Sequence, residues 1–128
     1  MDDAVYMSYK LEIKEEPRYL HANIKGKRTT ENIKEVTKEI LESCIKNQYS
    51  KILIDTREFS ERISNTMKIF DLASQELPDI IQKKIKKVAI VDLDGFEEDK
   101  RFFETVALNR GHNVKIFADL NKAQEWLL

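Results

Sequence analysis

Apolar and polar residues alternate along two short stretches near the start of the chain, residues 8–15 and 18–26. The apolar positions are Tyr9, Leu11, Ile13, Leu20, Ala22 and Ile24. A period of two is typical of a β-strand with one buried and one exposed face. A short segment containing Pro17 separates the two stretches. The pattern therefore predicts two adjacent strands that pair as an antiparallel hairpin.

The period changes to that of a helix over residues 29–48. Apolar residues form one stripe there, made of Ile33, Val36, Ile40, Leu41, Cys44 and Ile45. Either Thr29 or Thr30 is expected to cap the N-terminus, and Glu31 in the first turn suits the helix dipole. Because Cys44 belongs to the apolar stripe, we expect a buried structural thiol rather than a nucleophile.

Three apolar segments alternate with helical patterns along the rest of the chain. Strands are predicted at residues 51–56, 87–93 and 113–118, the second of them buried on both faces. Helices are predicted from about residue 64 to residue 77, over 96–111 and over 119–128, with a further turn or short helix at 79–84 and a loop at 57–64. The order predicts a single α/β domain over residues 1–128. Its mixed five-stranded sheet would begin with the antiparallel hairpin, continue in βα units and be flanked by about four helices.

Composition narrows the classes of function. The chain has 128 residues, 41% hydrophobic and 35% charged, with a formal net charge of −1. Such a balance does not favour nucleic-acid binding. A single cysteine rules out an internal disulfide, and neither a signal peptide nor a transmembrane segment is expected, so a cytoplasmic protein is predicted. The three glycines lie far apart, which excludes a P-loop or a dinucleotide fingerprint.

Residues 87–127 carry a more specific pattern, an apolar strand followed by a helix, a second strand and a closing helix. The matching positions are Arg101, Phe102, Phe103, Glu104, Asn109, Arg110, Gly111, Val114, Phe117, Ala123, Trp126 and Leu127. The pattern and the element order resemble STAS domains, the fold of anti-sigma-factor antagonists and of sulfate-transporter tails. Within that group they resemble the SpoIIAA-like branch.

The resemblance implies a regulatory or small-ligand module, and some members of the group are likened to CRAL-TRIO lipid binders. Anti-sigma antagonists carry a phosphorylatable serine at a helix start, in an Asp-Ser-Ser-Gly context after the third strand. Here Asp55 fits the strand end and Ser64 falls near the expected helix start, although the Asp-Ser-Ser-Gly sequence itself is absent. The resemblance therefore implies Ser64 as the candidate phosphorylation site.

The segment Asp92-Leu93-Asp94-Gly95 is similar to the nucleophile motif of haloacid-dehalogenase-type phosphatases. That motif continues with threonine, where this chain has Phe96, and its later acidic pair is missing. The alternative function, a Mg²⁺-dependent phosphohydrolase that uses the strand-end aspartates, rests on this similarity. The favoured interpretation of Asp92 and Asp94 is a strand exit followed by turn residues.

Two further chemistries need aspartates at strand ends: a phospho-aspartate and a metal site. A receiver-like phospho-aspartate at Asp55 lacks the lysine expected after the last strand. Asp55, Asp92 and Asp94 would meet at one sheet edge if their strands are parallel neighbours, and carboxylates suit Mg²⁺ or Ca²⁺. Solvated strand-end carboxylates are the favoured interpretation, so neither a metal nor a cofactor is expected. The basic run of residues 83–87 is interpreted as a solvated helix end.

Ligands of open α/β sheets bind beyond the carboxyl ends of the strands. We therefore expect this edge to meet a protein partner or a small ligand, either lipid-like or anionic. The candidate residues are Asp55, Arg57, Phe59, Arg62, Ser64, Asp92, Asp94 and Phe96. The predicted function is a non-catalytic regulatory or binding module, and a homodimer is one arrangement open to it.

Overall fold

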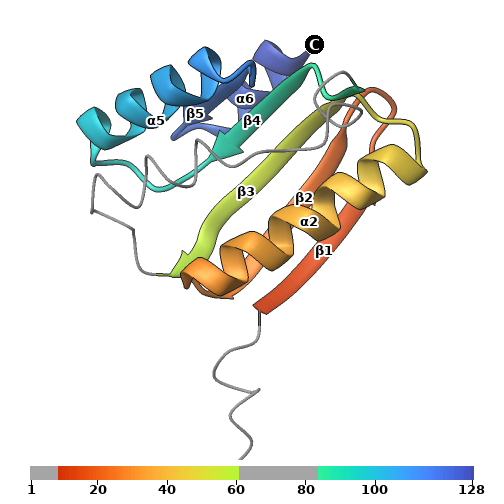
Figure 1. Cartoon of the computed structure of the whole chain (residues 1–128), viewed down its shortest axis with the longest axis horizontal. Helices are drawn as coiled ribbons and strands as arrows, with labels where there is room; N and C mark the ends of the chain where they lie inside the picture. The colour runs from red at the N-terminus through yellow and green to blue at the C-terminus, as the bar shows by residue number, and fades with distance from the viewer. Residues whose placement is uncertain (1–8, 61–83) are drawn as a thin grey trace, which may run out of the picture.

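Five strands form one mixed sheet in which the order across the sheet follows the order along the chain (Figure 1). The computed structural model describes residues 9–60 and 84–128. The strands are β1 (Tyr9–Glu15), β2 (Leu20–Lys27), β3 (Lys51–Ser60), β4 (Lys87–Val91) and β5 (Val114–Phe117). β1 and β2 pair antiparallel, and β2 to β5 pair in parallel. The predicted α/β class, with its opening hairpin and mixed five-stranded sheet, is confirmed.

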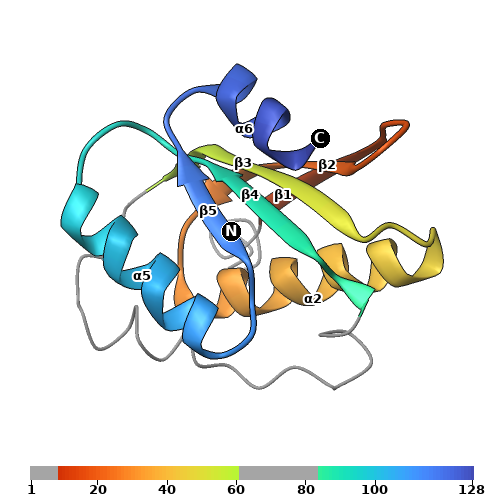
Figure 2. The same ribbon diagram turned by 90° about the horizontal axis from the view of Figure 1, so that it is seen from above.

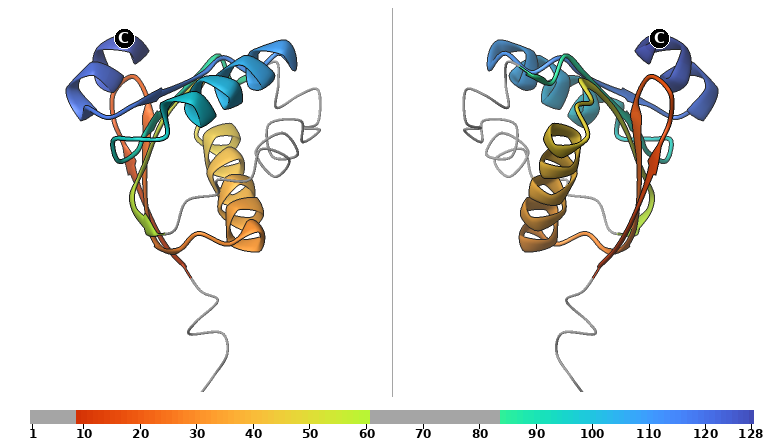
Figure 3. Two further views of the ribbon diagram at one scale, coloured as in Figure 1. Left: turned by 90° about the vertical axis from the view of Figure 1, so that its left-hand side faces the viewer. Right: turned by 90° about the vertical axis from the view of Figure 1, so that its right-hand side faces the viewer.

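Three helices flank the sheet in the described part of the chain, α2 (Thr30–Lys46), α5 (Glu97–Asn109) and α6 (Leu120–Leu127). α2 and α5 lie on one side of the sheet and α6 on the other (Figures 2 and 3). No helix among the described residues is both long and apolar enough to span a membrane. The helix expected from about residue 64 to residue 77 falls outside the described residues.

Short-range capping sets the helix ends. The Thr29 hydroxyl accepts a hydrogen bond from the Asn32 backbone N–H at 3.0 Å, so Thr29 is the N-cap of α2. The Asp119 carboxylate accepts from the backbone N–H of Asn121 at 2.8 Å and caps α6 in the same way. Gly111 has φ +87° just beyond the end of α5, a left-handed conformation that favours glycine after a helix.

Two hydrophobic clusters, one on each side of the sheet, make up the core. One cluster joins the sheet to α2 and contains Leu20, Ala22, Ile24, Val36, Ile40, Leu41, Cys44, Ile52 and Phe59. The other joins the sheet to α6 and contains Tyr19, Leu53, Ala89, Val91, Ala123 and Leu127. The neighbouring residues Ile52 and Leu53 belong to different clusters because successive side chains of a strand point to opposite faces. β3 is therefore buried on both faces.

β3 continues four residues beyond the predicted strand end, so the expectation of a loop from residue 57 is wrong for residues 57–60. The pairing of β2 with β3 changes register between Asn23, opposite Asp55, and Lys25, opposite Glu58. One extra residue on β3 is accommodated there as a β-bulge. The bulge shifts the alternation by one, so that Phe59 enters the cluster beneath α2. The interrupted period made this half of the strand resemble a loop.

β4 is shorter than the sequence pattern predicts, because it ends at Val91 rather than at residue 93. Ala89 and Val91 are fully buried, whereas Val88 and Ile90 are half-buried. The prediction of a central parallel strand is confirmed, but burial is complete only on the side that faces α6. Asp92 is therefore the first residue after the strand.

α5 closes the edge of the sheet at β5. The Glu104 carboxylate accepts a hydrogen bond from the Ile116 backbone N–H at 2.7 Å, and Arg101 Nη2 donates to the Ile116 carbonyl at 3.2 Å. Arg101 and Glu104 also form an ion pair at 3.2 Å. The two side chains take the place of a neighbouring strand at the N–H and the carbonyl of Ile116. Covering an exposed edge in this way blocks pairing with other chains.

We predict that Glu104→Ala lowers the free energy of unfolding by about 1–3 kcal/mol, since a partly buried N–H of the edge strand loses its acceptor. Glu104→Gln is the matched control, because the amide oxygen can still accept that hydrogen bond. Urea unfolding followed by circular dichroism measures both variants. Equal losses in the two variants would contradict the assigned role of the hydrogen bond to Ile116.

Candidate functional site

Asp55 and Arg57 form an ion pair at the bulge of β3. Asp55 accepts hydrogen bonds from the backbone N–H of Arg57 at 3.1 Å and from its Nε and Nη2 at 3.0 and 2.7 Å. Burial would raise the pKa of Asp55, but the hydrogen bonds and charge of Arg57 outweigh it and hold the pKa below its usual value. The contact with the backbone N–H spans two residues, which stabilises the bulge locally.

Arg28, which joins β2 to α2, connects the ends of three strands. Its Nη2 donates to the Thr56 carbonyl at 3.0 Å and its Nε donates to the Phe59 carbonyl at 3.1 Å. The guanidinium also pairs with the Asp92 carboxylate at 3.3 Å, and both side chains are largely buried, with 14% and 11% exposed. The guanidinium carbon lies 5.3 Å from the centre of the Phe59 ring. One cation thus satisfies the carbonyls of the bulge and the carboxylate that follows β4.

Hydrogen bonds hold the backbone of the loop after β4, and apolar side chains of the same loop are exposed to solvent. Its first residue, Asp92, donates its backbone N–H to the Phe117 carbonyl at 2.9 Å, and the buried Lys100 donates its Nζ to the Leu93 carbonyl at 2.7 Å. The side chains of Leu93 and Phe96 are 57% and 52% exposed. The loop therefore presents two large apolar side chains from an anchored backbone.

The same loop has an unusual backbone at its end. Gly95 has φ +107° and Phe96 has φ +54°, the left-handed region. An aromatic residue in that region costs on the order of 1–2 kcal/mol. Asp94 accepts a hydrogen bond from the Gly95 N–H at 3.0 Å, which is typical of a turn. The chain leaves this turn directly into α5, with Phe96 at the N-cap position.

The structure places six of the eight candidate residues at or beside this edge, namely Asp55, Arg57, Phe59, Asp92, Asp94 and Phe96. They serve in different ways, because Phe59 is buried in the core whereas Phe96 is exposed. Arg62 and Ser64 lie outside the described residues. Sequence reasoning missed Arg28 and Lys100. A basic residue directly after a strand that ends at this edge is the signal that could have pointed to Arg28.

Both buried aspartates already pair with arginine, Asp55 with Arg57 and Asp92 with Arg28. Among the described residues, no group of three or more histidine, cysteine or acidic side chains could hold a metal ion. The carboxylates therefore stabilise this edge through arginine contacts.

Burial shifts the pKa values of three further titratable side chains, Cys44, His21 and His112. Burial raises the pKa of the Cys44 thiol to about 12, so it stays protonated inside the core. Burial also lowers the pKa of His21, although the nearby charge of Asp55 opposes this shift. His21 is therefore neutral at pH 7, as is His112, whose pKa burial also lowers. Neither histidine serves as a permanent positive charge.

The model of the SpoIIAA-like family matches residues 19–128, most of the chain. The chain belongs to the SpoIIAA-like family. A search of curated proteins finds no match.

Two solved structures share the SpoIIAA-like fold seen here. One is an uncharacterized protein from the DUF3478 family of Shewanella loihica, with 23% identity, 94% of each chain covered and a TM-score of 0.56. The other is an anti-sigma factor antagonist from Mycobacterium paratuberculosis, with 11% identity, 94% of each chain covered and a TM-score of 0.57. These similarities confirm the fold suggested by the C-terminal sequence pattern.

We predict that Arg28→Met lowers the free energy of unfolding by about 3–5 kcal/mol, because it leaves the buried Asp92 carboxylate without its arginine. The same change should cost less in an Asp92→Asn background, where no charge is stranded. A double-mutant cycle followed by urea unfolding measures the coupling. Additive effects of Arg28→Met and Asp92→Asn would contradict the pairing.

The Asp55–Arg57 pair should make the free energy of unfolding depend on pH in the acidic range. Because the pKa of folded Asp55 lies below its usual value of 3.8, the pair contributes stability above that pH. The contribution is lost as the pH falls through the lower, folded-state value. Arg57→Ala should therefore destabilise the protein at pH 7 and have a smaller effect at pH 3, measured by urea unfolding. An equal effect at the two pH values would contradict the assignment.

Proposed function

We propose that this SpoIIAA-like protein is a non-catalytic regulatory module that binds a protein partner at the carboxyl edge of its sheet. The family and the fold shared with an anti-sigma factor antagonist support a regulatory role. The proposed setting is the cytoplasm, where such a partner would be met. The Ser64 hydroxyl remains our candidate for phosphorylation that would control the interaction.

The observation that carries this proposal is the anchored loop with Leu93 and Phe96 exposed. Arg28 holds the start of the loop through Asp92, and Lys100 holds the Leu93 carbonyl. A surface that is ordered before binding loses little conformational entropy when a partner docks. Aromatic side chains are also enriched among the residues that dominate protein interfaces.

The exposure of the loop favours a protein over a small ligand. One pocket formed by described residues lies between β1 and α2, on other elements than this loop. Small ligands usually need a concave site that covers most of their surface, whereas an exposed loop suits a protein surface. A lipid-like or anionic ligand, or a second copy of the chain, remains compatible with a binding module.

The carboxyl-edge proposal predicts site-specific photo-crosslinking in the host cell. A benzoylphenylalanine at position 96 should give a discrete protein adduct, since this side chain would face the partner. Leu108, which is 63% exposed near the other end of α5, is the matched control position. Mass spectrometry then identifies the adduct, and Leu93→Asp should remove it while circular dichroism shows an unchanged fold. The same adducts from positions 96 and 108, or none from position 96, would contradict the proposal.

A further inference from the structure

The two edges of the sheet differ in how they are protected. At β5, Arg101 and Glu104 occupy the N–H and carbonyl of Ile116. At the opposite edge, β1 pairs with β2 on one side, and no strand of the described residues lies on its other side. An open edge of seven residues offers backbone donors and acceptors to an added strand. This surface is separate from the carboxyl edge.

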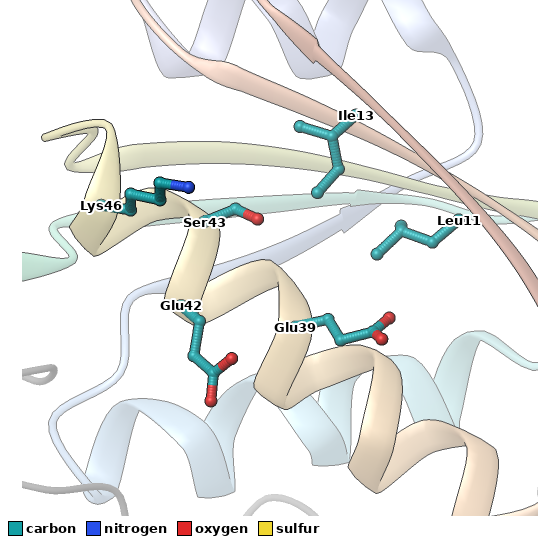
Figure 4. A pocket seen from close by; sticks show the side chains of 6 residues that line it. All are labelled: Leu11, Ile13, Glu39, Glu42, Ser43 and Lys46. Atoms are coloured by element: carbon teal, nitrogen blue, oxygen red, sulfur yellow. The ribbon is translucent and has the colours of Figure 1, made fainter.

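A shallow groove accompanies the open edge of β1. Leu11 and Ile13 point toward α2 and are half-buried, so apolar surface reaches the edge of the sheet (Figure 4). α2 lines the other side of the groove, which has a volume of about 340 Å³, with Glu39, Glu42, Ser43 and Lys46. A strand added beside β1 would place every second side chain over this groove. The groove therefore favours an occupant with alternating apolar residues.

β1 itself has the pattern that such an occupant needs. On the face away from α2 its exposed residues are Lys10, Glu12 and Lys14, with alternating charge. If two copies of β1 pair antiparallel about Leu11, Lys10 of each lies opposite Glu12 of the other. Pairing about Ile13 places Glu12 opposite Lys14 in the same way. Opposite charges across two strands stabilise the pair, whereas like charges destabilise it.

The charged residues of α2 that line the groove are also complementary between two copies. Glu39 and Glu42 precede Lys46 along α2, and a two-fold axis across the edge turns the second α2 to run the opposite way. The acidic part of one groove then faces the basic end of the other. A pairing centred on Glu12 would instead bring Glu12 against its own copy and Lys10 against Lys14. The charges thus select one class of register.

We propose that β1 docks against β1 of a second copy of this chain, antiparallel and about a two-fold axis at Leu11 or Ile13, so that two sheets become one. The self-complementary charges favour a second copy over an unrelated extended peptide. Lysines on an edge strand usually discourage pairing, but here one lysine of β1 lies opposite Glu12 of the symmetric partner in either register. The dimer would leave both carboxyl edges available to their partners.

Charge reversal in the full chain tests the proposal by sedimentation equilibrium. Wild type should dimerise, and Glu12→Lys should weaken the dimer about tenfold, because two attractive cross-strand pairs become repulsive. Adding Lys10→Glu should restore affinity to within about threefold if the axis passes at Leu11, and adding Lys14→Glu should do so if it passes at Ile13. A wild-type monomer at every concentration overturns the proposal. Failure of both double variants to recover affinity also overturns it, as does unchanged dimerisation of Glu12→Lys.

Cysteine crosslinking provides a second measurement that does not depend on charge. Cys44 is fully buried, so a disulfide that forms between two chains on oxidation involves the introduced cysteine. Leu11→Cys or Ile13→Cys, whichever lies at the axis, should form a disulfide-linked dimer, whereas the exposed control Leu108→Cys should not do so at the same concentration. Preferential crosslinking of Glu12→Cys, or equal crosslinking at all positions, overturns the proposed register. Capture of another protein along β1 by a monomeric chain would overturn the choice of occupant.

Discussion

The carboxyl edge of this sheet depends on one cation, Arg28, which contacts the backbone of β3 and the Asp92 carboxylate that follows β4. β3 needs a donor for the carbonyls around its bulge, and Asp92 needs a positive charge because its side chain is largely buried. A guanidinium supplies several donors in one plane, so it meets these needs together. The bulge that places Phe59 in the core and the loop that exposes Phe96 are thus held by the same side chain.

The two edges of the sheet differ in whether side chains cover their backbone hydrogen-bonding groups. α5 both follows the exposed loop and covers the β5 edge through Arg101 and Glu104. Those two residues belong to the sequence pattern that resembles the SpoIIAA-like branch, and their contacts with Ile116 give them a structural role here. The opposite edge, at β1, has no such cover among the described residues. The sheet of this protein therefore has an exposed loop after β4 and, within the described part of the chain, an edge at β1 with no strand beside it.

Much of the fold could be predicted from the sequence because its signals are local. Alternation predicted β1 and β2, and Thr29, one of the two expected N-caps, caps α2 in the structure. The prediction failed where a tertiary constraint changed a local period, at the bulge of β3. The last four residues of that strand have the sequence pattern of a loop, since one extra residue reverses which side chains point inward.

The sequence by itself determined the order of strands and helices, and hence that Asp92 and Phe96 follow a central parallel strand at its carboxyl end. Only the tertiary structure showed how each is used. The partner of Asp92 is Arg28, 64 positions away along the chain, a separation at which no sequence period carries information. Two aromatic residues near this edge likewise have opposite environments: the bulge of β3 places Phe59 in the core, whereas Phe96 is exposed in a left-handed turn. Burial depends on strand register and turn geometry, which are set when distant segments pack together.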